Sequence, residues 1–230
     1  MMLRRFVPFA ALLLTAALAS AQPPAFALGA SARQAPDDKQ AAQERADAEA
    51  DAPKLIPVLE LEPGMTVADV GAGFGAMTVV LARLDKTGKV IATDIVERQL
   101  AVIRDYIKRE GLQNVTVVQS GAASANLPDG CCDAAFLRNV YHHITEVAAF
   151  NRSLFAALKP GGRLAIIDAA PDAGSALPRG VPANREGHGI RSSIVRDELS
   201  AAGFIVDKTF DKWPPDDKTP AYLVLARKPR

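Results

Sequence analysis

The feature that most constrains the fold is a glycine-rich segment directly after a short apolar run. Residues 67–70 are apolar apart from Asp69, and glycine then occupies every second position from 71 to 75. Glycines allow a tight turn and let the backbone approach a ligand closely before a helix begins. Asp94 ends a second apolar run about twenty residues later, the spacing at which a carboxylate accepts hydrogen bonds from ribose hydroxyls. The pattern predicts a strand–turn–helix unit that binds an adenosine-containing cofactor.

Two cofactor classes are compatible with these glycines, besides the structural alternative of an ordinary strand-to-helix turn. Gly71, Gly73 and Ala76 satisfy the G-x-G-x-x-G/A fingerprint of dinucleotide-binding proteins. Asp69 followed by Gly71, Gly73 and Gly75 satisfies the pattern of an acid and G-x-G-x-G that binds S-adenosylmethionine (SAM). A carboxylate at this position suits the ammonium of a methionine moiety better than a pyrophosphate, which prefers bare helix N–H groups. The sequence therefore favours SAM over NAD(P).

Apolar runs and amphipathic stretches alternate along the rest of the chain. We expect strands at 66–70, 89–94, 115–119, 133–137 and 163–168, helices at 39–50, 76–84, 97–110, 146–158 and 193–202, and a closing hairpin of 204–210 and 221–227. This alternation predicts an α/β fold whose parallel sheet carries helices on both faces. In such sheets the ligand lies at the carboxyl ends of the strands.

Two further motifs occur in a fixed order after the glycine loop. Leu-Pro-Asp-Gly (127–130) precedes the fourth strand and Leu-Lys-Pro-Gly-Gly (158–162) precedes the fifth. With these motifs, residues 55–228 resemble the class I SAM-dependent methyltransferases. Within that family the chain looks most like small exported bacterial methyltransferases that carry Tyr-His-His after the fourth strand, here residues 141–143, and a later lone histidine. The resemblance implies a Rossmann-like, doubly wound, mostly parallel seven-stranded sheet whose last strand is antiparallel between its neighbours.

The same resemblance suggests how SAM would be held. Asp94 would bind the ribose, and Asp69 would contact the methionine end, directly or through water, while also capping the glycine loop. Many relatives place an acid against the adenine amino group where this chain has Ala122 and Ala123, so backbone amides and apolar contacts would hold adenine here. The predicted cofactor-binding residues are Asp69, Gly71, Ala72, Gly73, Gly75, Asp94, Ile95, Ala122, Ala123 and Asn139.

Candidate catalytic groups follow the fourth and fifth strands. A neutral imidazole is suited to act as a general base near pH 7, so His143 or His188 would remove a proton from an acceptor that must lose one. Tyr141 would present its ring face to the sulfonium. The alternative roles are packing or loop hydrogen bonding for His142 and His143, and packing for Tyr141.

A metal site is geometrically conceivable from His142 or His143 together with His188 and Asp168. The spacing matches no known metal motif, however, and adjacent histidines rarely bind one ion together. The sequence therefore predicts no metal site.

The two cysteines of the chain, Cys131 and Cys132, are adjacent. Neighbouring cysteines rarely have the geometry of an unstrained bridge. We expect them to be small side chains that enter the fourth strand.

The N-terminal region has the three parts of a secretory signal peptide. Residues 1–21 contain Arg4 and Arg5, an apolar stretch at 6–18 that is too short to span a bilayer comfortably, and a final Ala-Ser-Ala. We expect residues 22–54 to form a linker and an N-terminal helix, which acts as a spacer or a lid, and residues 55–230 to form the SAM-dependent methyltransferase domain. The mature protein would be periplasmic or secreted without a membrane span, or cytoplasmic if the start codon is misassigned.

Composition limits the classes of partner. The formal net charge is +1 and there is no dense Lys/Arg cluster, which argues against a nucleic-acid partner. The sequence predicts a methyltransferase that moves the methyl group of SAM to an unidentified small-molecule acceptor. The alternatives are a non-catalytic SAM- or nucleoside-binding protein and, less favoured, an NAD(P)-dependent oxidoreductase, for which no Tyr-x-x-x-Lys pair is recognisable. The oligomeric state stays open.

Overall fold

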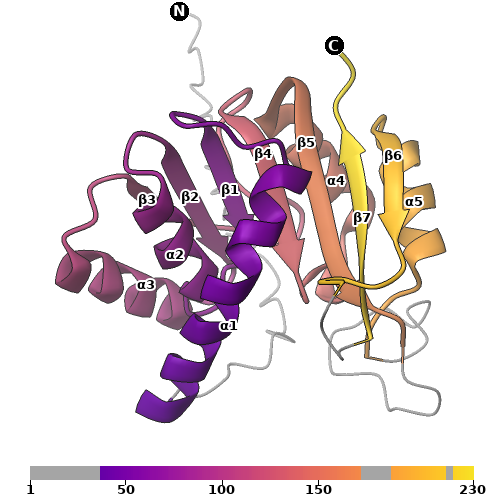
Figure 1. Cartoon of the computed structure of the whole chain (residues 1–230). Helices are drawn as coiled ribbons and strands as arrows, with labels where there is room; N and C mark the ends of the chain where they lie inside the picture. The colour runs from indigo at the N-terminus through magenta and orange to yellow at the C-terminus, as the bar shows by residue number, and fades with distance from the viewer. Residues whose placement is uncertain (1–36, 172–187, 216–219) are drawn as a thin grey trace, which may run out of the picture.

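The described part of the chain is built around one twisted sheet. Figure 1 shows its strands side by side, from β3 on the left to β6 on the right. The computed structural model describes residues 37–171, 188–215 and 220–230. The expected signal peptide (1–21) and the first part of the expected linker (22–36) lie outside these residues. Among the described helices, none is both long enough and apolar enough to cross a bilayer.

The sheet has seven strands in the order β3-β2-β1-β4-β5-β7-β6. Its strands are β1 (Thr66–Val70), β2 (Lys89–Asp94), β3 (Val115–Gln119), β4 (Cys132–Arg138), β5 (Leu158–Ala169), β6 (Ile205–Phe210) and β7 (Ala221–Arg227). The first five strands pair in parallel, whereas β7 pairs antiparallel with both β5 and β6. This confirms the predicted mostly parallel sheet with an antiparallel last strand between its neighbours.

Helices cover both faces of the sheet. They are α1 (Asp38–Val58), α2 (Ala76–Leu84), α3 (Glu97–Glu110), α4 (Val147–Ala157) and α5 (Ser192–Ala201), with a short 3₁₀ turn η1 (Tyr141–His143). Helices α1, α2 and α3 lie in front of the sheet in Figure 1, and α4 and α5 lie behind it. The parallel strands end at the lower edge in this view, where the glycine loop and η1 begin.

Two hydrophobic clusters explain why the central strand β4 is a continuous apolar run. Ala134 and Phe136 pack toward α1 and α2, while Ala135 and Leu137 pack toward α4 and α5. All four side chains are at most 1% exposed. A strand that is buried on both faces must be apolar at every position, because its side chains alternate between the two faces. The free energy gained by burying a residue such as Phe136 is about 1.5–3 kcal/mol.

Helix α1 is longer than the sequence predicts. We expected a helix over 39–50, yet α1 continues through Pro53 and Pro57 to Val58. Each proline removes a backbone donor, which normally ends a helix. Burial offsets this loss, because Ala48, Ala52 and Leu55 form one face that is at most 1% exposed and packs beside α2. The N-cap is as expected, since Gln40 N donates to the Asp37 carboxylate over 2.8 Å.

The entry into β4 and β5 differs from the prediction in two ways. Residues 158–162, which the sequence placed before the fifth strand, already belong to β5, where Leu158 pairs with Cys132 ahead of a register shift. Cys131 and Cys132 are joined by a disulfide, so the expectation of two separate small side chains is wrong. Distance rules for bridges between separate segments do not apply to neighbours, whose Cα atoms, 3.7 Å apart here, are fixed by the chain itself.

Candidate active site

The glycine loop between β1 and α2 depends on left-handed backbone conformations. Gly71, Gly73 and Gly75 have φ values of 75°, 56° and 80°. A Cβ on Gly71 would lie 2.5 Å from Val140, and one on Gly75 would lie 2.7 Å from Ile103. A Cβ on Gly73 would meet nothing within 4 Å. Gly71 and Gly75 are therefore required by packing, whereas Gly73 borders open space in which a ligand can approach the backbone.

Asp94, at the end of β2, holds this loop in place. Its Oδ2 accepts a hydrogen bond from Gly73 N and its Oδ1 accepts one from Val96 N, both over 2.9 Å. The Gln99 amide nitrogen also lies 2.7 Å from Oδ1 in the orientation that satisfies both groups. Burial raises the pKa of Asp94, against the opposing effect of these backbone N–H groups. A carboxylate offers about four acceptor positions, so Asp94 retains capacity for a ribose hydroxyl.

Asp69 is the second buried acid of this edge, and only 4% of it is exposed. Thr78, on the first turn of α2, donates its hydroxyl to Asp69 Oδ2 over 2.6 Å. Burial raises the pKa of Asp69 to about 6, and the nearby Asp94 adds to the rise, while Thr78 and Arg138 oppose it. A buried carboxylate with this pKa would be stabilised by a bound cation such as the ammonium group of a methionine moiety.

The expected adenine region lies next to Asp94. Ser120 N, after β3, donates to the Asp94 carbonyl over 3.0 Å and brings the following loop to the end of β2. Ala122 is half-buried and Ala123 is exposed. Ile95 is one of the few large apolar side chains with substantial exposure, at 36%. None of these three side chains carries a carboxylate, and their contact with adenine stays a prediction.

The end of β4 closes the other side of the glycine loop. Asn139 is exposed, has a left-handed φ of 56° and donates its N–H to the Ile167 carbonyl over 2.8 Å. Val140 then packs against Gly71, so the chain that follows β4 lies directly beside the cofactor loop. Arg138 pairs with Asp51 of α1 over 2.8 Å. This ion pair fixes α1 beside the same edge, where the sequence predicted a spacer or a lid.

Tyr141 is completely buried within the cluster formed with α4 and α5. Its hydroxyl oxygen accepts a hydrogen bond from Asn151 Nδ2 over 2.7 Å. This burial favours packing, the alternative role that the sequence left open. Contact between its ring and a sulfonium stays a prediction.

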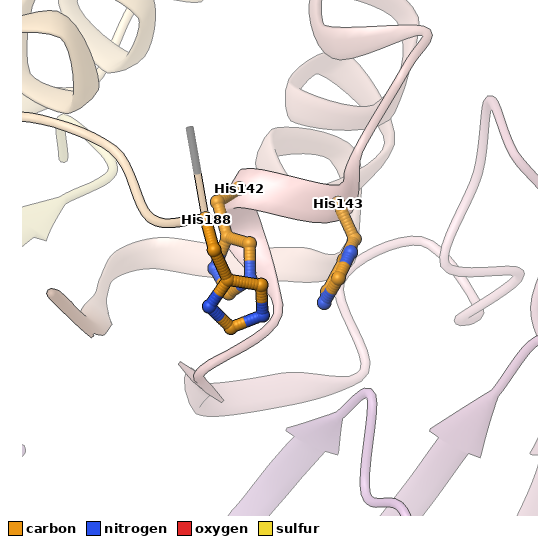
Figure 2. A group of neighbouring side chains, drawn as sticks. All are labelled: His142, His143 and His188. Atoms are coloured by element: carbon orange, nitrogen blue, oxygen red, sulfur yellow. The ribbon is translucent and has the colours of Figure 1, made fainter. Parts of the chain in front are cut away.

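The three histidines of the chain, His142, His143 and His188, come together at this edge (Figure 2). The ring centroids are 4.0 Å apart for His142 and His143, and 4.6 Å apart for His142 and His188. One ligand atom from each ring lies within 4.8 Å of the others. The sequence argument was that adjacent histidines rarely bind one ion together. In the structure, however, the 3₁₀ turn places the rings of His142 and His143 near each other and near the ring of His188.

His142 is the anchor of this histidine cluster. It is 2% exposed, and its Nδ1 lies 2.9 Å and 3.0 Å from the two carboxylate oxygens of Asp168. The backbone N–H of His142 also donates to Asp168 Oδ2 over 3.2 Å. Asp168 is the penultimate residue of β5 and is 1% exposed. The pair therefore links the turn after β4 to the end of β5 in the interior of the protein.

A short anchored segment positions His188. The next residue, Gly189, has a φ of 123°, and a Cβ there would lie 2.6 Å from the Ala169 carbonyl oxygen. Ile190 N donates to the same carbonyl over 2.8 Å, and the Ile190 carbonyl accepts a hydrogen bond from the buried Tyr222 hydroxyl. This close approach, which only glycine permits, brings His188 to the end of β5.

Sequence reasoning missed two supporting residues and the role of a third. Thr78 and Gln99 each contact one of the buried acids, and no motif marks them. Asp168 was considered only as one possible metal ligand, whereas the structure gives it the role of orienting His142. Its position at the end of an apolar strand was the available signal.

Comparison with known proteins agrees with this geometry. Residues 68–166 match the family described as "Methyltransferase domain". The ubiquinone/menaquinone biosynthesis C-methyltransferase UbiE of Salmonella arizonae is 36% identical over 107 residues. That match covers 46% of this chain and 43% of the relative, so the chain matches less than half the length of this curated relative.

Solved structures share the fold over most of the chain. A SAM-dependent methyltransferase from Aquifex aeolicus is 26% identical, with a TM-score of 0.64 over 81% of this chain and 97% of that protein. The [4+2]-cyclase SpnF has the same TM-score of 0.64 at 20% identity, over 83% of this chain and 82% of SpnF. The second similarity concerns the fold alone. The family match at residues 68–166, the similarity to UbiE and the order of the strands each support a methyltransferase domain of the SAM-dependent type.

Proposed function

We propose that this protein is an enzyme that transfers the methyl group of SAM to a small-molecule acceptor. The observation that carries the proposal is the pair of buried acids, Asp69 and Asp94, on either side of a glycine loop with open space at Gly73. A dinucleotide would place its pyrophosphate at the glycine loop beside Asp69, where the two negative charges would repel each other. SAM instead offers a ribose for Asp94 and a cationic methionine end for Asp69.

The chain would contribute mainly alignment to the reaction. SAM supplies an electrophilic methyl group, which passes to the lone pair of the acceptor as the bond to sulfur breaks. Asp94 and the glycine loop would fix the nucleoside, and Asp69 would fix the amino-acid end, so that the methyl group faces the acceptor side. Holding two reactants in line can account for about 7–11 kcal/mol of a barrier.

A proton must also leave when the acceptor is a hydroxyl, thiol or ammonium group. His143 and His188 are both exposed, in contrast to the buried His142, and can therefore reach a bound acceptor. Either imidazole would take up that proton as a general base. The turn that carries His143 begins directly after Val140, which packs on the cofactor loop.

The finer assignment rests on the sequence. We place the protein among the exported bacterial methyltransferases with a Tyr-His-His turn, acting in the periplasm or outside the cell. Support comes from residues 1–21 and from the position of residues 141–143 after β4. The acceptor of UbiE is not carried over, because that match covers less than half of either protein.

Titration calorimetry is the direct test of cofactor choice. We expect SAM and its demethylated product to bind one per chain, and NAD(P) to bind at least about tenfold more weakly. Tight NAD(P) binding without SAM binding would reject the proposal.

Catalysis needs its own experiment. Purified protein with methyl-labelled SAM should transfer label into the low-molecular-weight fraction of an extract, and mass spectrometry would identify the product that gains one methyl group. SAM binding without any transfer would instead support the non-catalytic alternative. Sequencing the mature N-terminus after cell fractionation tests export.

A further inference from the structure

We propose that the histidine cluster His142, His143 and His188 binds one divalent transition-metal ion, of which Zn²⁺ is the representative. The chain has no other histidine, and all three converge from two segments that are 45 residues apart in sequence. Imidazole nitrogen is a preferred ligand of zinc, copper and nickel, and three histidines with one open position form a known type of zinc coordination. Figure 2 shows the three rings around one space.

The strongest evidence is the buried Nε2 atom of His142. This nitrogen is buried and has no hydrogen-bond partner among the residues that the structure describes. Because the Asp168 carboxylate faces Nδ1, the ring proton resides on Nδ1 and a lone pair is left on Nε2. A buried polar atom without a partner costs about 1–3 kcal/mol. A metal ion at Nε2 would remove this cost.

The pair of Asp168 and His142 has the arrangement that metal sites use to orient their ligands. Histidine ligands commonly donate their second ring N–H to a carboxylate, which fixes the tautomer and strengthens the ligand. Asp168 is itself held, because the Ala169 N–H donates to its Oδ1 over 2.8 Å. One of the three ligands is thus pre-oriented before any ion binds.

The observed separations are close to those of a metal site. In a tetrahedral site with zinc–nitrogen bonds of about 2.0–2.1 Å, the nitrogens lie about 3.4 Å apart. In the structure, the three ligand atoms lie within 4.8 Å of one another. Closing this difference requires movements of about 1.4 Å or less, estimated from the same bond lengths. His143 and His188 are exposed, whereas His142 is buried and held by Asp168.

The open fourth position would face the acceptor side of the site. This part of the inference rests on the proposed methyltransferase function, whereas metal binding does not. A metal ion lowers the pKa of a bound hydroxyl or thiol, so that its proton passes to solvent before the lone pair attacks the methyl group. The metal would then promote loss of the proton to solvent, whereas without metal a single histidine would accept this proton as a base.

The primary experiment titrates chelator-treated, untagged protein with zinc, because a polyhistidine tag would itself bind the ion. Calorimetry and elemental analysis after dialysis should both give one Zn²⁺ per chain. Mg²⁺, which prefers oxygen ligands, should not compete. Imidazole NMR should show all three histidines shifting together. Absence of bound zinc at equimolar concentration would overturn the inference.

Variants locate the site. His188→Ala and His143→Ala change exposed side chains, so the proteins should fold, and each should weaken zinc binding by at least about 100-fold. Asp168→Asn should weaken it by about 10–100-fold while leaving the stoichiometry at one. Gln43→His adds an exposed histidine on α1 as a matched control and should leave affinity unchanged. Zinc binding that persists in His188→Ala would contradict this site.

SAM binding, measured in the metal-free protein, separates the two proposals. Protein that binds SAM but no zinc refutes the metal site and leaves the methyltransferase intact. Protein that binds zinc but no SAM supports the metal site and refutes the methyltransferase proposal.

Discussion

The two halves of the carboxyl edge are built by different means. On the side of β1, β2 and β3, the cofactor half consists of a backbone loop and two acids that lie within 26 consecutive residues, Asp69 to Asp94. On the side of β4 and β5, the histidine cluster combines residues 142 and 143 with Asp168 and His188. The first half is specified by local sequence, the second by contacts between distant segments.

The difference also lies in what holds each half in place. In the cofactor half, the hydrogen bonds that tie Asp94 to Gly73 and Val96 come from backbone N–H groups, which any sequence with the same fold supplies. The Gln99 side chain adds one further contact. In the histidine half, the pair of His142 and Asp168 is side chain to side chain and almost entirely buried. The first half should therefore tolerate changes in its neighbours, while the second should fail if one partner is removed.

The largest expected effect is on cofactor binding. Asp94→Ala removes the ribose acceptor and the partner of Gly73 N together, and each charge-assisted hydrogen bond contributes about 1.5–3 kcal/mol. We expect SAM affinity to fall by at least about 100-fold in calorimetry. Asp207→Ala, which breaks an exposed pair with Arg227, is the control and should bind SAM normally. Equal loss in both variants would mean that Asp94 has no specific role.

The next effect should appear in stability rather than in binding. Asp168→Ala leaves His142 buried without its partner, and breaking a buried pair costs about 3–5 kcal/mol of unfolding free energy. Denaturant unfolding should show this loss, while SAM affinity of the folded variant should change by less than about threefold.

Asp168→Asn keeps a hydrogen-bonding group beside His142 and should recover part of the stability. A large loss of SAM affinity in this variant would show that the two halves are coupled and that the comparison is wrong.

Asp69 should show a conflict between function and stability. Its pKa of about 6, above the ordinary 3.8, means that the fold prefers the neutral carboxyl. The corresponding stability is fully present below pH 4 and is lost as pH rises through 6. At about 1.4 kcal/mol per pH unit, the loss reaches about 3 kcal/mol. Asp69→Asn should therefore stabilise the SAM-free protein by up to about that amount at pH 8, and by nothing at pH 4.

SAM binding should respond to pH in the opposite sense. The cationic end of SAM needs the ionised carboxylate, so affinity should fall below pH 6, approaching about tenfold per pH unit. Asp69→Asn should bind more weakly at pH 8 and show a flat profile between pH 5 and 8. A profile that stays flat in the unmodified protein would remove Asp69 from the cofactor site.

The sequence predicted the fold and the cofactor half because both depend on local signals. Apolar runs located all seven strands, and the closely spaced glycines marked the loop that begins at Gly71. In the structure these glycines have left-handed conformations. The gathering of His188 with His142 and His143 requires the chain to return to the end of β5 at residue 188. Only Gly189 hints at this return, and its close approach to Ala169 becomes apparent only in three dimensions.

Other differences arose where tertiary burial overrode local rules. The sequence predicted a helix that ends at residue 50, but the apolar face of α1 packs on α2 and carries the helix past two prolines to Val58. The Cys131–Cys132 disulfide has a different origin: the sequence predicted two small side chains because neighbouring cysteines rarely form an unstrained bridge.

The smallest predicted effect tests whether Gly73 serves the fold or the ligand. Gly73 and Gly111 have φ values of 56° and 65°, and a Cβ on either would meet nothing within 4 Å. Alanine at either position should therefore cost a similar amount of stability, about 1–2 kcal/mol for a left-handed residue. Only Gly73→Ala would place a methyl group where the cofactor approaches the loop, so only this variant should lose SAM affinity, by about tenfold or more. If Gly111→Ala, at the end of α3, weakens SAM binding equally, then backbone strain rather than contact explains the loss, and the open space beside Gly73 is not part of the site.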